Sequence, residues 1–208
     1  MPRRATAVYE PGTPANHVYF LESGLVKIER AVEGNRDILL SVVPAGDLFG
    51  EQALTGDEVF SCAARVLESG VAYAIPVDVF HQVCDRRPDM WRLVVQHTLS
   101  RLDSLERKIE HLCHSDVRSR LIFYLDELAR LNAGQEPGAV NLIHISQNEL
   151  ASLVGATRET TSTTLNTLAR QGLISLGHRL VMIPSLDALR SARDSVVARS
   201  TAAGQPQA

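Results

Sequence analysis

The sequence predicts an α+β protein with a strand-rich N-terminal part, a long helix and a C-terminal helix-turn-helix. Short apolar runs separated by glycine and other turn residues fill residues 5–76, which is typical of a small β-barrel or sandwich. From Asp89 the apolar period changes from two to about three and a half residues, as in a coiled-coil helix. Residues 145–174 then read as two short helices joined by a tight turn.

The N-terminal strands are expected where apolar runs stand between turn residues. The second half of Leu25–Arg30 alternates between apolar and polar residues, as a half-buried antiparallel strand does. Hairpin turns account for most of the regularly spaced glycines. The expected strands are Val18–Leu21, Leu25–Arg30, Ile38–Val43, Cys62–Leu67 and Val71–Ile75.

One glycine-bounded segment, Gly46–Glu51, has a second interpretation besides a turn. Backbone amides freed by glycine bind anionic groups, and the Glu51 carboxylate accepts hydrogen bonds from hydroxyls. Such a segment is able to wrap a small polar ligand. A turn with a solvated glutamate fits the same residues, so the residues alone leave both interpretations open.

Residues 89–115 carry apolar side chains at coiled-coil spacing, with charged residues on both sides. A narrow apolar stripe with charged flanks favours a partner helix, and the commonest partner is a second copy of the chain. The alternative is that the same face packs against the β-barrel. The stripe consists of Val95, Leu102, Leu105, Ile109 and Leu112.

The helix-turn-helix is predicted from its capping residues. Ser146 followed three residues later by Glu149 forms a capping box that opens the first helix, and Gly155 ends it. Thr157 is a good N-cap for the second helix, whose apolar residues recur at helical spacing.

The second helix opens with an unusual surface, Arg158–Thr164, which contains few residues that favour exposed helix. Short hydroxyls and free amides at a helix N-terminus hold phosphates, while Arg158 can pair with guanine and Glu159 can accept from cytosine N4. This surface suits the major groove of DNA. The alternative is an ordinary capped helix that tolerates Ser and Thr.

The elements around the helix-turn-helix follow from caps and turn residues. In order, they are a break at His114–Asp116, a helix capped by Asp116 that ends near Asn132–Gly134, a strand Val140–Ile145, a hairpin wing Leu173–Ile183 around Gly177 and His178, a helix Ser185–Val197 and a disordered tail Ser200–Ala208.

Composition excludes several classes of protein. The net charge of −3 does not exclude a DNA-binding protein, because only the face that meets phosphate must be positive. No secretory signal and no apolar run of about 18 residues is present, so we expect a cytoplasmic protein without a membrane partner. The three cysteines, Cys62, Cys84 and Cys113, are odd in number and widely spaced, which suits a reducing compartment.

Enzymes and metal proteins are not indicated by the motifs. The chain has no glycine-rich phosphate loop, no zinc-ligand spacing and no nucleophile elbow. His111, Cys113 and His114 stand at positions i, i+2 and i+3 of the long helix, where side chains diverge. We therefore expect no catalytic residue and no metal site.

The order of these elements resembles the cyclic-AMP receptor and fumarate-nitrate regulator (CRP/FNR) superfamily of bacterial transcription factors, from about Val8 to Ile183. Its most specific matches are the segments Pro44–Glu51 and Gly155–Thr160. The resemblance implies a cyclic-nucleotide-binding-like β-roll at residues 1–88, a dimerisation helix and hinge at 89–115, a winged helix-turn-helix at 116–197 and a disordered tail at 198–208.

The resemblance also implies roles for individual residues. The residues at DNA base-reading positions are Arg158, Glu159, Ser162 and Thr163, where Thr163 replaces a further arginine of the family and should weaken preference at its base pair. The residues at phosphate-contacting positions are Ser146, Gln147, Thr157, Thr160 and Arg179 of the wing.

The effector site departs from that of members that bind cyclic AMP. Their Arg-Ser or Arg-Thr pair, which grips the cyclic phosphate, aligns with Ser61-Cys62, and their adenine-contacting Thr-Ser pair aligns with Leu105-Glu106. Arg65 lies three residues after Cys62. An odd displacement along a strand places its side chain on the opposite face from that of Cys62. Only Gly50 and Glu51 remain, so we expect cyclic AMP not to bind tightly.

No cofactor is expected, because no cysteine precedes Cys62 to hold an iron-sulfur centre and no pair of haem ligands can be assigned. The resemblance implies a homodimeric regulator that binds a near-palindromic operator and, as an activator, contacts RNA polymerase. The departures at the effector site lead us to the hypothesis that it binds DNA without an effector. The alternatives are a different ligand in the roll, a redox input through Cys62, and an interaction module without DNA affinity.

Overall fold

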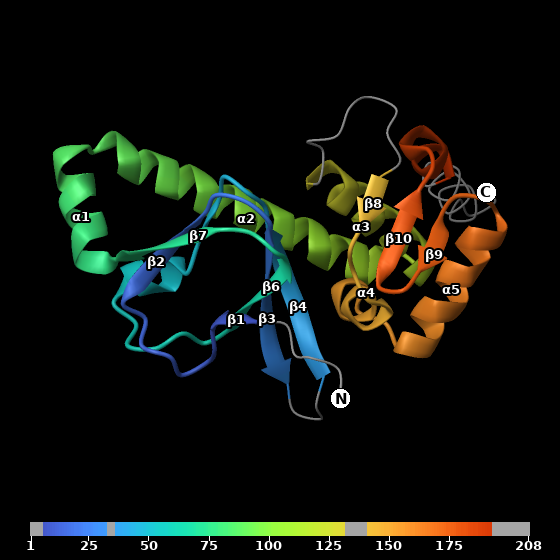
Figure 1. Ribbon diagram of the computed structural model, residues 1–208, viewed down its shortest axis with the longest axis horizontal. Helices are drawn as coiled ribbons and strands as arrows, with labels where there is room; N and C mark the ends of the chain where they lie inside the picture. Colours follow the sequence, from blue (N-terminus) through green and yellow to red (C-terminus); the bar gives the residue numbers. More distant parts are fainter. Residues whose placement is uncertain (1–5, 33–35, 132–140, 193–208) are drawn as a thin grey trace, which may run out of the picture. The chain divides into compact units, whose positions relative to one another are not determined.

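The structure, a computed structural model, describes residues 6–32, 36–131 and 141–192 (Figure 1). The chain divides into two compact units, Met1–Ile109 and Glu110–Ala208. This division falls inside the long helix that the sequence predicted to begin near Asp89. The C-terminal end of that helix therefore belongs with the second unit.

The N-terminal unit contains the predicted β-roll, with antiparallel strands in two sheets among the described residues. One sheet has the order β1-β6-β3-β4 and the other β5-β2-β7. The expected strands are confirmed to within two residues, whereas β1 and β5 were not predicted because such short strands show no period. The strands are β1 (Ala7–Tyr9), β2 (His17–Leu21), β3 (Leu25–Val32), β4 (Arg36–Val43), β5 (Leu48–Phe49), β6 (Ala63–Glu68) and β7 (Ala72–Pro76).

Aromatic rings fill the centre of the roll. The rings of Tyr9 and Phe60 stack at a centroid distance of 3.9 Å, and those of Tyr19 and Phe49 stack at 5.0 Å. Phe49 is completely buried and belongs to the same cluster as Val18 and residues from both sheets. Stacked rings bury large apolar areas, so this cluster accounts for much of the stability of the roll.

Two short elements of the N-terminal unit differ from the prediction. The 3-10 helix η1 (Glu51–Thr55), which was not predicted, lies between Gly50 and Gly56, which both have positive φ. Helix α1 (Val77–Arg86) was also missed, because only Phe80 and Cys84 are buried and its first residues favour strands. Both elements carry too few buried residues to show a period.

Helix α2 (Asp89–His114) confirms the long helix expected from Asp89. Its inner face packs on the roll through Val94, and the Lys108 ammonium donates to the backbone carbonyl of Leu39 on β4. Burial lowers the pKa of Lys108 to about 8. No helix among the described residues is long and apolar enough to cross a membrane.

The C-terminal unit is a winged helix-turn-helix, as the sequence predicted. Helices α3, α4 and α5 pack on one another, and the antiparallel sheet has the order β8-β10-β9. Its core contains the fully buried Leu121, Leu150, Leu165 and Ile183. The elements are α3 (Val117–Leu131), β8 (Asn141–Ile143), α4 (Gln147–Val154), α5 (Arg158–Arg170), β9 (Ser175–Gly177) and β10 (Leu180–Ile183).

The predicted helix starts around this core are confirmed. The Asp116 carboxylate accepts from the Ser119 amide at 2.7 Å, and the Ser185 hydroxyl accepts from the Ala188 amide at 3.2 Å. Residues 186–192 are helical. The remainder of the predicted last helix, the predicted tail and the predicted helix end near Asn132–Gly134 lie outside the described residues.

Candidate nucleic-acid interface

The turn between α4 and α5 is built from local capping contacts. The Ser146 hydroxyl accepts from the Glu149 amide at 3.2 Å, and the Glu149 carboxylate accepts from the Ser146 amide at 2.8 Å. Helix α4 ends at Gly155, where φ is 64° and an added Cβ would lie 2.7 Å from the Leu112 side chain. Glycine adopts this left-handed backbone conformation without strain and leaves room for the Leu112 side chain.

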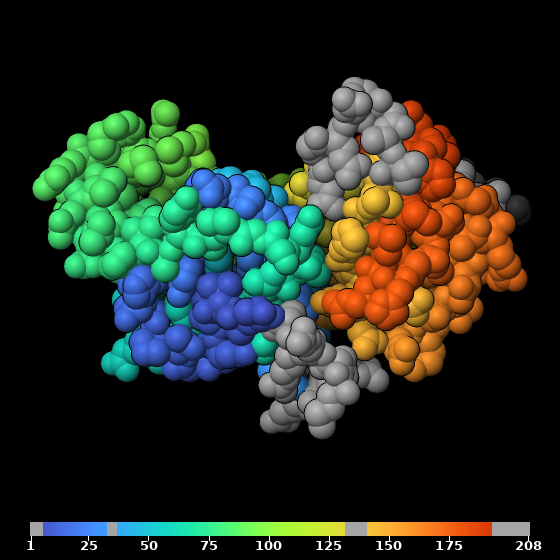
Figure 2. Space-filling view, in the orientation of Figure 1, coloured from blue at the N-terminus to red at the C-terminus, as the bar shows by residue number. Residues whose placement is uncertain are grey.

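Helix α5 presents a polar face to solvent. Thr157 caps the helix by accepting from the Thr160 amide at 3.1 Å, and Leu165 and Leu168 are completely buried on the inner face. Figure 2 shows α5, coloured orange, at the surface of the C-terminal unit. Of the residues predicted to read bases, Arg158, Glu159 and Thr163 are exposed, while Ser162 is half-buried.

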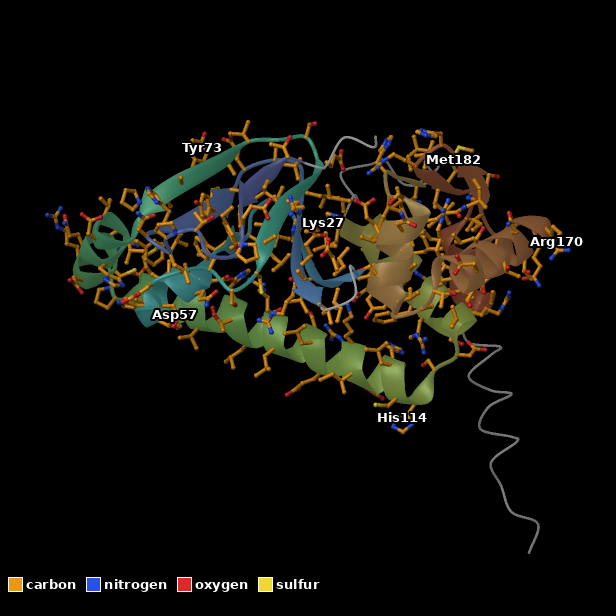
Figure 3. All side chains as sticks on the ribbon, turned by 90° about the horizontal axis from the view of Figure 1, so that it is seen from below. Lys27, Asp57, Tyr73, His114, Arg170 and Met182 are labelled. Atoms are coloured by element: carbon orange, nitrogen blue, oxygen red, sulfur yellow. The ribbon has the colours of Figure 1, made fainter. Side chains whose placement is uncertain are left out.

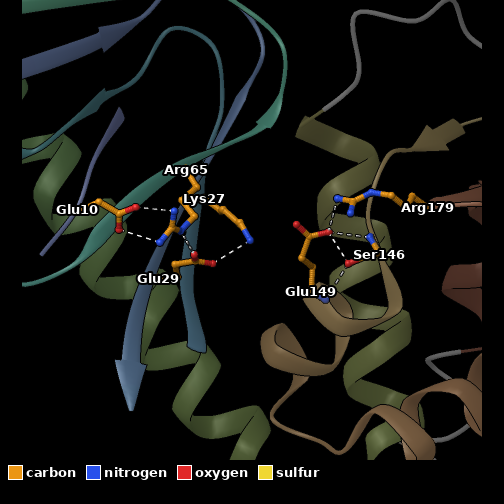
Figure 4. Close-up of polar contacts among 7 residues, drawn as sticks. All are labelled: Glu10, Lys27, Glu29, Arg65, Ser146, Glu149 and Arg179. Atoms are coloured by element: carbon orange, nitrogen blue, oxygen red, sulfur yellow. Dashed lines mark hydrogen bonds and ion pairs between the residues drawn. The ribbon is translucent and has the colours of Figure 1, made fainter. Parts of the chain in front are cut away.

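Two of the residues predicted to contact DNA phosphates, Ser146 and Arg179, are hydrogen-bonded to Glu149 (Figure 4). The Ser146 hydroxyl donates to the Glu149 carboxylate at 2.6 Å, and Arg179 Nη2 lies 3.3 Å from the same oxygen. Arg179 has a φ of 53°, which costs a residue other than glycine about 1–2 kcal/mol. Of the other predicted contacts, Gln147 begins α4 and is half-buried, while Thr157, the N-cap of α5, and Thr160 on α5 are exposed.

The apolar stripe of α2 is exposed. Leu102 and Ile109 expose 50% and 61% of their surface, and Val95, Leu105 and Leu112 are exposed as well. Figure 3 shows side chains projecting from α2 on the side away from the roll, along the helix toward His114. The roll therefore does not cover the face that the sequence predicted to be a dimer seam.

Glu51, part of the predicted effector-pocket remnant, is held by side chains of α2. Its carboxylate forms an ion pair with Arg101 and lies 3.1 Å from His97 Nε2, which is also 2.9 Å from the Leu48 carbonyl oxygen. Burial opposes ionisation of Glu51, but the hydrogen bond from His97 and the Arg101 charge lower its pKa. The hydrogen bond to Glu51 raises the pKa of His97 above its ordinary value despite burial. The neighbouring Gly50 has a φ of 77°.

Ser61 and Cys62 lie beside an arginine from another strand. Arg30 Nη2 is 3.4 Å from Ser61 Oγ and 3.3 Å from Cys62 Sγ. Arg65 instead forms ion pairs with Glu29 and Glu10. These contacts agree with the prediction that Arg65 is directed away from Ser61 and Cys62.

The histidine on α2 that could have suggested a metal site has structural contacts instead. The ring of His111 lies 4.0 Å from that of Phe123, and its Nδ1 is 3.2 Å from the Ser115 hydroxyl. Among the described residues, no group of three or more His, Cys, Asp or Glu side chains is arranged to hold a metal ion.

Comparisons with known proteins agree with this architecture. Residues 3–87 match the cyclic nucleotide-binding domain family, and residues 119–192 match the Crp-like helix-turn-helix domain family. The CRP-like cAMP-activated global transcriptional regulator of Mycobacterium tuberculosis is 30% identical over 187 residues, which cover 89% of this chain and 84% of the relative. This chain belongs to the CRP/FNR superfamily of transcription regulators.

Two further regulators match the chain over a similar length. The global nitrogen regulator of Synechocystis is 29% identical over 183 residues, covering 86% of this chain and 81% of the relative. A solved CRP/FNR-family regulator from Thermus thermophilus has a TM-score of 0.77 at 26% identity, covering 91% of this chain and 95% of that one. These relatives are transcription regulators and not enzymes.

Four residues of this CRP/FNR regulator that lie at the predicted sites were not predicted from the sequence. Leu99 is 57% exposed and stands four residues after Val95, so its helical spacing was a usable signal. Arg30, His97 and Arg101 contact partners 31 to 50 residues away along the chain. No local pattern indicates such contacts, because strand register and helix docking create them.

Proposed function

We propose that this regulator binds a near-palindromic DNA site as a homodimer and controls transcription there. Two copies of α5 enter successive major grooves about one turn of DNA apart. The observation that carries the proposal is the exposed start of α5, led by Arg158 and Glu159 and supported by the buried Leu165 and Leu168. Because bacterial DNA is cytoplasmic, the protein acts in that compartment, where a bound dimer contacts RNA polymerase and activates transcription.

The homodimer is supported by the exposed stripe of α2. Val95, Leu99, Leu102, Leu105 and Ile109 recur at steps of three or four residues, which is the spacing of a coiled-coil seam. Leaving five large apolar side chains in water is unfavourable, and a second α2 helix covers them by symmetry. The dimer also doubles the DNA contacts, since each copy supplies one α5 helix.

Independence from cyclic AMP is supported by the contacts of Glu51. Its carboxylate is already paired with Arg101 and hydrogen-bonded to His97. Both contacts are made by Glu51 Oε1, so a nucleotide hydroxyl would have to compete there with charged donors, which bind a carboxylate more strongly than a hydroxyl does. We therefore propose that Arg101 and His97 of α2 bind the Glu51 carboxylate in place of a nucleotide. In this respect the chain would differ from the relative from M. tuberculosis, which is named as cAMP-activated.

A second candidate is a regulator that responds to an anion or to oxidation in the roll. The observation in its favour is Arg30, whose guanidinium donates toward Ser61 and Cys62 and stabilises a negative charge there. Selection of bound sequences from random DNA distinguishes the candidates. Specific enrichment by reduced, ligand-free protein supports effector independence, whereas enrichment only after mild oxidation or addition of a phosphate ester supports the second candidate. Failure to enrich any sequence under all conditions rejects DNA recognition.

Replacing Arg158 with Ala is expected to weaken binding to the selected site by about 1–3 kcal/mol and to relax preference at one base pair per half-site. The reason is that an arginine hydrogen-bonds two acceptors of guanine, which alanine cannot do. Binding is measured by gel shift on the selected site and on single-base variants. Equal weakening on all sequences, with a smaller salt dependence, would show that Arg158 contacts only phosphate.

Cyclic AMP at about 1 mM is expected to leave the thermal unfolding midpoint of the protein unchanged. A nucleotide that bound with a Kd about 100 times lower than this concentration would stabilise the folded protein by about 2.7 kcal/mol and raise the midpoint. The reason is that Glu51 is occupied and Ser61-Cys62 offers no arginine. Thermal scans with and without nucleotide test this expectation, with Arg30→Ala as the control variant. A rise of several degrees that Arg30→Ala removes would instead show that Arg30 substitutes for the missing arginine.

A further inference from the structure

The polar residues of α5 differ in whether their side chains are already used within the helix. The Thr157 and Thr160 hydroxyls lie 3.0 Å apart at the N-cap. Thr164 donates to the Thr160 carbonyl at 2.8 Å, and Thr167 donates to the Thr163 carbonyl at 3.0 Å. These hydroxyls are committed to the helix backbone or its cap, as Ser and Thr in helices often are.

Asn166 differs from these threonines. Its side chain is exposed, and among the described residues it has no hydrogen-bond partner. Asparagine is a poor helix former in a helix interior, and an exposed one gains nothing from packing. Neither helix stability nor the core therefore explains asparagine at this position.

The position of Asn166 on α5 aligns it with a predicted base-reading residue. Asn166 stands seven positions after Glu159. A step of seven positions turns an α-helix to within about 20° of two full turns. Asn166 and Glu159 therefore share one face of the helix, with Thr163 between them. The two Cα atoms are about 10 Å apart along the helix axis, which is long enough for the two side chains to meet different base pairs of one major groove.

We infer that Asn166 is a further specificity-determining residue and reads adenine in the major groove. The inference rests on the proposed function, because it requires α5 to lie in that groove. A carboxamide matches the major-groove edge of adenine with two hydrogen bonds, because its N–H donates to N7 and its oxygen accepts from the N6 amino group. The adenine belongs to a different base pair from the one that Glu159 reads and occurs once in each half-site.

Selection from random DNA with three forms of the full-length protein tests this inference. The unmodified protein is expected to enrich an A·T pair at that position, and Asn166→Ala is expected to lose this preference alone. Its affinity for the selected site should fall by about 5- to 150-fold. Thr164→Ala is the matched control, because it also shortens a polar side chain of α5 but removes a hydroxyl that is bonded to the helix backbone. This control should keep the complete sequence preference.

A fourth variant tests the chemistry of recognition. Asn166→Asp presents two acceptors and is expected to exchange adenine for cytosine at the same position, because cytosine N4 is a donor. Identical preferences for Asn166→Ala and the unmodified protein would overturn the inference while leaving the proposed function intact. Uniform weakening on all sequences would also overturn it, because that result identifies a phosphate contact. If the unmodified protein enriches no sequence, the proposed function and the inference both fail.

Discussion

Replacing Leu102 with Glu is expected to convert the dimer into monomers and to reduce affinity for the palindromic site by about 10²- to 10⁴-fold. Leu102 lies in the middle of the exposed stripe of α2 and is half exposed in the single chain. In a symmetric dimer, the substitution places two carboxylates opposite each other in an apolar seam, where neither has a counter-ion. Each half-site is then bound separately, so the gain from linking two α5 helices is lost.

Light scattering coupled to size-exclusion chromatography measures the mass, and gel shift on full and half sites measures the binding. Ser100→Glu is the matched control, because it adds the same charge to an exposed position of α2. Ser100 stands two residues before Leu102 and lies nearly opposite the centre of the stripe. This variant should remain dimeric. A dimeric Leu102→Glu protein would show that the chains associate through a different surface.

Replacing Glu29 with Ala is expected to destabilise the N-terminal unit by about 3–5 kcal/mol. Glu29 is 6% exposed and lies between two cations, 2.9 Å from Lys27 Nζ and 2.5 Å from Arg65 Nε (Figure 4). Its removal takes from both cations the buried carboxylate that they share, and Glu10, the other ion-pair partner of Arg65, is more exposed. Denaturant unfolding followed by the fluorescence of Trp91, which packs against the core of the roll, measures the loss.

Glu10 provides the control for this experiment. Its carboxylate lies 2.7 Å from Arg65 Nη1, but its side chain is 46% exposed. Water replaces an exposed partner at little cost, so Glu10→Ala should destabilise by less than about 1 kcal/mol. Equal effects of the two substitutions would contradict the role assigned to burial of Glu29.

Local signals made the DNA-binding half of the fold predictable. The Ser146 and Glu149 capping box, the Gly155 stop and the Thr157 cap each depend on residues within four positions of one another, so the sequence contains the whole interaction. The wing was predicted from two apolar runs on either side of a turn.

In the N-terminal unit, by contrast, helix α1 was not predicted, because it buries too few side chains to show a helical period in the sequence.

The surroundings of the roll site were less predictable, because they depend on distant residues. Glu51 and Arg101 are 50 positions apart, and their contact requires α2 to lie against the roll with a particular rotation. Arg30 reaches Cys62 only because β3 and β6 are paired in one register. The sequence identified which positions depart from the family pattern but not the side chains that replace the missing contacts.

The pairing of Glu51 with His97 also makes the attachment of α2 to the roll sensitive to acidity. His97 faces Asp47 and Glu51 on the roll and Arg101 on its own helix, and its raised pKa means that its contribution is complete below pH 6.5 and is lost as pH rises through the folded-state value. Glu51 has a lowered pKa, so its contribution is complete above pH 4.5 and is lost as pH falls through the folded-state value. Mildly acidic conditions are thus those in which the helix is held most firmly.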